Sequence, residues 1–147
     1  MTDGSEGQDQ RAAAAAKGGL RKVQNRRLII ACSANSLARV KKEVADGADV
    51  NVVDAQGVPV LTFAAMGGHF EIAKFLIEQG ARVNATTPSG ESALSFSIRL
   101  GPRQEDVFDL LLENGADINL FQKPLPLIHR ASDIGSVNIV RRLIECG

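Results

Sequence analysis

The chain has 147 residues, the length of one domain, and its 17 basic and 17 acidic residues leave no net charge. This balance gives no overall attraction to nucleic acid or to an anionic membrane, so neither is expected as a partner. No apolar run approaches the roughly 18 residues that a membrane span needs. The polar start MTDGSEGQDQ also differs from a secretion signal, so a cytoplasmic or nuclear protein is expected.

Residues 1–27 are predicted to form a disordered, basic N-terminal segment. Residues 1–11 carry Gly, Ser, Gln and acids without periodic apolar residues, a composition typical of disorder. The alanine run at 12–16 favours a helix, but Gly18 and Gly19 should end it quickly. This stretch is therefore expected to be a frayed turn at most.

Basic residues gather at the end of this segment, ahead of the first repeat. Leu20, Val23 and Leu28 have roughly helical spacing, so a lead-in helix could cover the first repeat. The basic cluster at 21–27 is read either as a targeting signal or as a solvated approach to that helix. The segment's basic residues are Arg11, Lys17, Arg21, Lys22, Arg26 and Arg27.

A ten-residue sequence motif recurs along the rest of the chain. It reads VADGADVNVV (44–53), IEQGARVNAT (77–86) and LENGADINLF (112–121), and a fourth copy stops at 144–147. Its glycine returns after 33, 35 and 32 residues. A period of about 33 residues indicates a stacked solenoid made of a turn and two helices per unit.

The second unit shows the two helices most clearly. Its apolar residues fall at helical spacing in two short runs, separated by Gly68 and ended by Gly80. The runs are Leu61, Ala64 and Ala65, then Ile72, Ala73, Leu76 and Ile77. The other units fit the same frame, which divides a repeat domain at 28–147 into units at 28–53, 54–86, 87–121 and 122–147.

Residues 57–84, GVPVLTFAAMGGHFEIAKFLIEQGARVN, resemble the ankyrin repeat pattern G-x-T-P-L-H-x-A-A-x-x-G-H-x-x-x-V-x-x-L-L-x-x-G-A-D-V-N. The resemblance extends over about residues 28–147, in four units. It implies an all-α solenoid of helix-turn-helix units joined by β-hairpin-like loops. It also implies a non-enzymatic module that binds a partner protein.

Three departures from the pattern affect local structure. Pro59 and Pro126 replace the threonine that caps the first helix, so those helix starts should be looser, while Ser92 keeps a hydroxyl. Two extra residues at 101–104 should enlarge a turn between helices. One residue is missing before Pro124, so the fourth hairpin should be short.

By the resemblance, partners bind a concave face made by the hairpin tips and the exposed side of the first helices. Phe121 is the favoured anchor, since aromatic residues often dominate interface energy. Some of these side chains could instead pack on adjacent hairpins, and the sequence leaves both readings open. The candidates are Gln56, Val58, Met66, Ser89, Glu91, Arg99, Leu100, Phe121, Lys123, Leu125, Asp133 and Ile134.

The repeat asparagines Asn51, Asn84 and Asn119 match the position at which ankyrin proteins can be β-hydroxylated. Asn84-Ala85-Thr86 is also a formal glycosylation sequon, but it coincides with the repeat's own asparagine, so a structural role is expected.

Metal and nucleophile chemistry is not expected, and no cofactor is predicted. Cys32, Cys146, His69 and His129 lie in different units without zinc-ligand spacing. Cys32 is predicted to be a packed core residue, and both cysteines to be reduced thiols.

The last helix has the pattern of an internal repeat rather than a polar cap. This predicts that the chain is the N-terminal part of a longer protein, as an interaction module or as the regulatory or targeting arm of an enzyme or channel. Alternatively, its open end associates with another copy. The residues expected on that end are Ile139, Val140, Leu143 and Ile144.

Overall fold

The structure, a computed structural model, describes residues 5–99, 105–120 and 126–147, with the backbone only at residues 5–10, 12 and 14. Within these ranges the chain forms helices joined by turns and loops. The helices are α1 (Ser5–Ser33), α2 (Leu37–Ala45), α3 (Val60–Gly67), α4 (Phe70–Glu78), α5 (Ala93–Ser97), α6 (Glu105–Glu113), α7 (Leu127–Ile134) and α8 (Val137–Cys146).

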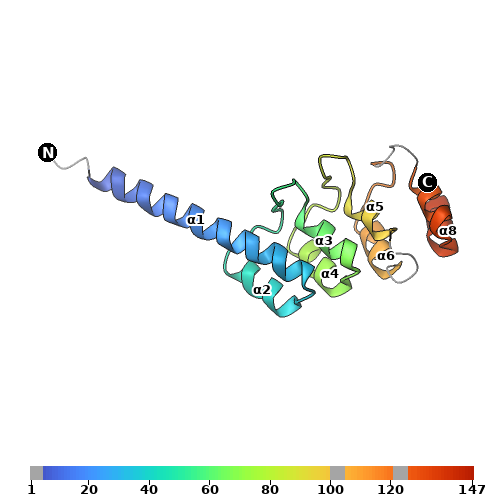
Figure 1. Ribbon diagram of the computed structural model, residues 1–147, viewed down its shortest axis with the longest axis horizontal. Helices are drawn as coiled ribbons and strands as arrows, with labels where there is room; N and C mark the ends of the chain where they lie inside the picture. The colour runs from blue at the N-terminus through green and yellow to red at the C-terminus, as the bar shows by residue number, and fades with distance from the viewer. Residues whose placement is uncertain (1–4, 100–104, 121–125) are drawn as a thin grey trace.

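The helices stack as antiparallel pairs along one axis, with the two termini at opposite ends (Figure 1). The C-terminal part of α1 lies beside α3, and α3 lies beside α5, so the first helices of the units form one layer. Helices α2, α4 and α6 form the second layer. The loops between units project from the side of the first layer, which confirms the predicted all-α solenoid.

The loops turn in the same way in successive units. Isolated antiparallel bridges join Val53 to Pro59 and Thr86 to Ser92, so each loop closes as a short hairpin. A side-chain oxygen of Asp54 accepts the N–H of Val58 at 2.8 Å inside the first hairpin. Thr87 takes the equivalent role in the next one and accepts the N–H of Glu91 at 3.1 Å.

Small and aliphatic side chains form a continuous core between the layers. Small residues such as Ala64 and Ala73 are fully buried, which lets adjacent helices approach closely. Cys32 is also fully buried, as predicted, and Phe108 is the largest fully buried side chain.

Left-handed residues end the first helix of several units. Gly68 and Gly135 have φ values of 66° and 75° and cap α3 and α7, where a Cβ would be strained. In the first unit Asn35 takes this conformation at φ 53°, since asparagine tolerates it better than most residues.

Asparagine side chains link each hairpin to the next unit. Asn51 donates to the carbonyl of Gly80 at 3.2 Å and accepts the N–H of Arg82 at 2.8 Å. Asn84 repeats this one unit on, with Gly115 at 3.0 Å and Asp117 at 2.8 Å. These paired bonds fix the separation and rotation of neighbouring units.

Helix α1 supplies the same link to the first unit. Its Asn25 accepts the N–H of Asp49 at 2.8 Å, and Arg21 forms an ion pair with Asp49 at 3.7 Å. Asp49 is the second residue after the repeat glycine Gly47, as Arg82 is after Gly80. Asn25 thus takes the place of the asparagine that a preceding repeat would supply.

The predicted disorder of residues 1–27 is wrong for residues 5–27, which belong to helix α1. Gly18 and Gly19 lie inside this helix and do not end it. Strong helix formers surround them, and the helix continues from the end that packs on the stack, so propagation needs no new nucleation. The N-terminal half projects away from the repeats (Figure 1).

The helix starts follow the predicted capping only in part. Pro59 and Pro126 make no side-chain cap bond, as expected for proline. The Ser92 hydroxyl, however, is buried and has no hydrogen-bond partner among the described residues. Ser95 closes that helix start instead, because its Oγ accepts the N–H of Ser92 at 3.0 Å and donates to its carbonyl at 2.8 Å.

The C-terminal helix α8 packs differently from the prediction. Ile139 and Leu143, expected on the open end, are instead buried in the hydrophobic core. Val137 and Ile144 are the large apolar side chains of α8 that stay exposed.

Candidate partner-binding surface

One position at the end of the first helix of each unit, or just after it in the case of Arg99, faces solvent throughout the stack. Ser33, Met66, Arg99 and Asp133 occupy equivalent places near the helix ends, and all four are exposed. The row is chemically varied, since it carries a hydroxyl, a thioether, a guanidinium and a carboxylate. The four side chains lie at the surface rather than in the core, so core packing does not fix which residue stands at each position.

The centre of this row combines apolar and cationic surface. Met66 on α3 is 42% exposed. Arg99 lies over the ring of Phe96 with its guanidinium carbon 5.4 Å from the centroid, a distance at which cation–π attraction holds the side chain in place. Phe63, one repeat earlier than Phe96, is half-buried against the core.

The hairpin candidates present both side chains and polar backbone. Gln56 and Ser89 are exposed, and Val58 is half-buried. Ser89 shares a hydrogen bond with the hydroxyl of Thr87 at 2.9 Å, which fixes the second hairpin tip.

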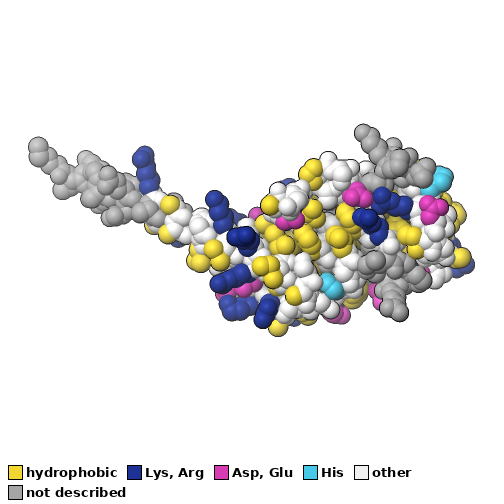
Figure 2. Space-filling view, viewed as in Figure 1, with side chains coloured by type: hydrophobic (Ala, Val, Ile, Leu, Met, Phe, Trp, Pro, Cys, Tyr) yellow, Lys and Arg dark blue, Asp and Glu magenta, His cyan; other side chains and the backbone are white. Residues whose placement is uncertain are grey.

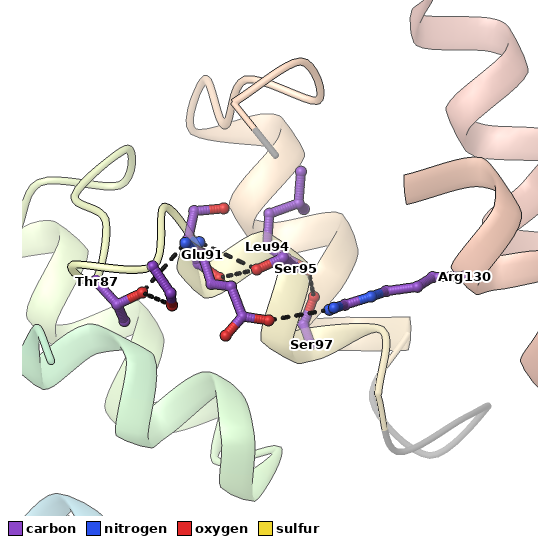
Figure 3. Close-up of polar contacts among 8 residues, drawn as sticks. Thr87, Glu91, Leu94, Ser95, Ser97 and Arg130 are labelled. Carbon is purple, nitrogen blue, oxygen red and sulfur yellow. Dashed lines mark hydrogen bonds and ion pairs between the residues drawn. The ribbon is translucent and has the colours of Figure 1, made fainter. Parts of the chain in front are cut away.

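Glu91 is tied to the next unit by an ion pair (Figure 3). Its carboxylate lies 3.2 Å from the guanidinium of Arg130 on α7, and both side chains are partly shielded from solvent. Sequence reasoning singled out Glu91 and missed Arg130, because Arg130 replaces the apolar residue that other units carry at that position, such as Phe96. The pair links the second hairpin to α7.

The remaining candidates are divided between packed, exposed and undescribed positions. On α7, Asp133 is exposed and Ile134 is half-buried against the core. Leu100, Phe121, Lys123 and Leu125 lie outside the described residues.

A groove of about 750 Å³ runs between adjacent hairpins and was not predicted from the sequence. Apolar residues such as Val53 and Val83 line it together with Asn51 and Asn84. It contains none of the predicted partner-binding residues. A repeat pattern gives no signal for such a groove, since the width of the groove depends on the relative positions of neighbouring loops.

The three asparagine candidates for hydroxylation differ in their contacts. Asn51 and Asn84 use both side-chain groups to bond the next unit, whereas Asn119 makes no such side-chain bond to the described residues. All three are exposed.

The chemistry of the cysteines is that of structural thiols. Burial raises the pKa of Cys32 to about 12, so its nucleophilic thiolate form is scarce at neutral pH. Cys146 is exposed, and both cysteines are free.

In the described part of the chain, no group of three or more His, Cys, Asp or Glu side chains could hold a metal ion. None of the described helices combines the length and apolarity required to cross a bilayer.

Comparison with known proteins identifies related sequences and a matching family model. A family model described as ankyrin repeats (3 copies) matches residues 28–122. The chain is 28% identical over 122 residues to the ankyrin repeat and KH domain-containing protein mask-1 of Caenorhabditis elegans. It is 33% identical over 98 residues to a fem-1 homolog A-like protein of Mus musculus. It is 46% identical over 52 residues to an acyl-CoA-binding domain-containing protein 6 homolog of Dictyostelium discoideum.

These alignments cover 82%, 67% and 35% of this chain, but the chain spans only 5%, 15% and 18% of the three relatives. The matched residues 28–122 include the helix pairs from the C-terminal part of α1 to α6, with their hairpins. Because this match covers well over half of the sequence and coincides with the observed repeats, the chain belongs to the ankyrin repeat family.

Proposed function

We propose that this chain is a protein-recognition module that binds its partner on the face formed by the hairpins and the exposed side of the first helices. Ankyrin repeats are generally protein–protein interaction modules, and the family is typically non-catalytic. The observation that carries the proposal is the exposed row Ser33, Met66, Arg99 and Asp133, whose chemically varied side chains lie at the surface rather than in the core.

The surface is held in shape before a partner arrives. The paired asparagine bonds and the Glu91–Arg130 ion pair connect adjacent units on this side of the molecule. A preorganised surface loses less conformational entropy on binding, which raises affinity without additional contacts.

A double variant tests this face. Met66→Ser with Arg99→Glu removes apolar surface and reverses a charge at two exposed positions, so stability should change by no more than about 0.5 kcal/mol per position. Capture from lysate with the parent chain identifies a partner, and titration with that purified partner should then show at least about tenfold weaker binding by the variant.

Lys74→Glu provides the matched control, because Lys74 is exposed on α4 in the other layer. It should leave affinity unchanged. Equal weakening by the control, or a large loss of thermal stability in the double variant, would place the binding surface elsewhere.

The extent of the repeat domain is part of this proposal. We assign it to residues 28–147 in four units, with α7 and α8 as the fourth. These two helices pair with each other as the earlier pairs do, beyond the residues that the family model matches. We place the protein in the cytoplasm or nucleus, where free thiols such as Cys32 and Cys146 remain reduced.

A second candidate role is the recognition or targeting arm of a larger protein. The small fraction of each relative that the chain spans, 5–18%, supports it, and the names of two of them include a KH or an acyl-CoA-binding domain. The full reading frame tests this role, since downstream domain sequence would support it and a stop codon after Gly147 would exclude it.

The alternative role of the C-terminal unit is to bind a second copy of this chain. Val137 and Ile144 expose apolar surface on α8. Sedimentation across a range of concentrations should then show reversible dimers that Ile144→Ser abolishes.

Hydroxylation is proposed at Asn51, Asn84 or Asn119. Asn119 is the favoured site, because its side chain makes no bond to a following unit within the described residues, whereas those of Asn51 and Asn84 do. Peptide mass spectrometry of protein purified from its own cells should find one added oxygen atom at the modified site.

A further inference from the structure

Helix α1 carries a second apolar surface that the stack does not use. Exposed apolar residues recur along it at spacings of three and four, which is the a and d pattern of a coiled coil. The apolar side chains are substantial, with Leu20 60%, Val23 46% and Ile30 61% exposed. We call this row the seam; it consists of Ala13, Ala16, Leu20, Val23, Arg27 and Ile30, all exposed.

The seam is separate from the side of α1 that packs on the repeats. Leu28 and Cys32, which are fully buried, and Asn25, which bonds Asp49, occupy the b and f positions of the same heptads. The b and f positions lie on the opposite side of a helix from a and d. Ala31, at an e position beside the seam, is also buried, so near the repeats the seam borders solvent on its g side. The helix can therefore hold the first repeat and present its seam at the same time.

The projecting half of α1 extends away from the repeats (Figure 1). Apart from its chain neighbours and the nearby backbone of α1 itself, a Cβ built at Gly18 or Gly19 would meet no described atom within 4 Å. An isolated helix of this length is marginal in water, and a partner that packs along it would supply the missing stabilisation.

Charge indicates what kind of helix fits the seam. The sequence from 11 to 42 contains nine basic residues and no acidic one. Figure 2 shows Lys and Arg side chains gathered along α1 and α2. Lys17 and Arg26 fall at the e and g positions that flank the seam, and Arg27 interrupts it at an a position.

We propose that the seam of α1 binds an acidic amphipathic helix of a partner protein as a two-helix coiled coil. Leu20, Val23 and Ile30 pack between apolar residues of that helix, and its carboxylates face Lys17, Arg26 and Arg27. This site adjoins the face of the proposed function, because Ile30 lies one turn before Ser33 on α1. Most of the seam lies on the projecting part of α1, and the proposal does not depend on the proposed function.

Other occupants match the surface less well. A second copy aligned in parallel would place Arg27 against Arg27 and bring two basic helices together. Nucleic acid offers phosphates for the basic residues but nothing that packs at a spacing of three and four residues. The seam carries no aromatic residue of the kind that anchors interfacial membrane helices.

A synthetic three-heptad peptide tests the proposal with the whole chain. The probe has Leu at a and d, Glu at e and g, and one further Glu placed opposite Arg27; a matched peptide has Lys in place of every Glu. Fluorescence anisotropy at physiological ionic strength should show the acidic peptide binding at least about tenfold more tightly than the basic one.

Variants separate the seam from general charge. Leu20→Ala with Val23→Ala keeps helix propensity and should weaken binding at least about tenfold. Arg27→Glu should shift the preference toward the basic peptide. Lys22→Gln removes a charge of the same helix at a c position and should change affinity by less than about twofold.

Four results would overturn the proposal. One is equal binding of both peptides, and another is equal weakening by Lys22→Gln and the seam variant. The third is a concentration-dependent dimer in sedimentation that the seam variant abolishes, which would make a second copy the occupant. The fourth is displacement of the bound peptide by polyuridylate or by anionic vesicles at matched charge. This would mean that the surface binds polyanions in general rather than an acidic helix.

Discussion

The repeat asparagines join units through two hydrogen bonds each. Asn84 bonds the carbonyl of Gly115 at 3.0 Å and the N–H of Asp117 at 2.8 Å. We expect Asn84→Ala to lower the free energy of unfolding by about 1–2 kcal/mol, since each such bond contributes about 0.5–1.5 kcal/mol net. Urea denaturation followed by circular dichroism measures the change.

Asn119→Ala is the matched control for this prediction. Asn119 occupies the equivalent repeat position and is exposed, but its side chain bonds no following unit in the described chain. Its substitution should change stability by less than about 0.5 kcal/mol. Equal effects of the two substitutions would show that the bonds between units are not the source of the loss.

Glu43 occupies a core position in the first unit. It lies four residues before Gly47, where the later units have Leu76, Leu111 and Leu143, and it is only 8% exposed. Its Oε2 is buried without a hydrogen-bond partner among the described residues. We expect Glu43→Leu to raise the free energy of unfolding by about 1–3 kcal/mol, because an unpaired polar group leaves the interior.

A thermal melt measures this change. Glu78→Leu, at an exposed position on α4, is the control and should have little effect. A lower melting temperature for Glu43→Leu would mean that the carboxylate has a partner that it needs in the folded protein.

At the scale of the element, the two halves of α1 have different surroundings. Its C-terminal part packs on the first unit, whereas Gly18 and Gly19 lie in the projecting part. Replacing both by Ala should stabilise that part by about 1 kcal/mol per residue and raise far-ultraviolet helicity. Open space around both sites leaves room for the added methyl groups.

Gly80→Ala serves as the opposite control, since Gly80 has φ 92° and a Cβ would be strained there. It should lower stability where the α1 substitutions do not. Unchanged helicity in the Gly18 and Gly19 variant would mean that the projecting part is already fully helical or is held by something else.

At the scale of the molecule, a solenoid transmits stability only through contacts between neighbours. The units built from α3 to α6 have a neighbour on each side, whereas α8 exposes Val137 and Ile144. Native-state hydrogen exchange should therefore show the greatest protection in α3–α6, less in α8, and the least in the projecting half of α1. Uniform protection across these helices would indicate that the chain unfolds as one cooperative unit.

Local chemistry determined much of this protein directly. Apolar spacing and the returning glycine predicted paired helices, hairpins and their period, because burial on one helical face and left-handed turns depend on residues close in sequence. The packed Cys32 followed from its place in the repeat, and its burial is observed.

Only the tertiary structure decided which side chains meet across units. Three features join residues from different parts of the stack. They are the Glu91–Arg130 ion pair, the bond from Asn25 of α1 in the place of a repeat asparagine, and the groove between hairpins. The same holds for α1, whose glycines predicted an early end while its packing on the first repeat let the helix continue. These features depend on the rotation and spacing of stacked units, which a pattern within one repeat does not contain.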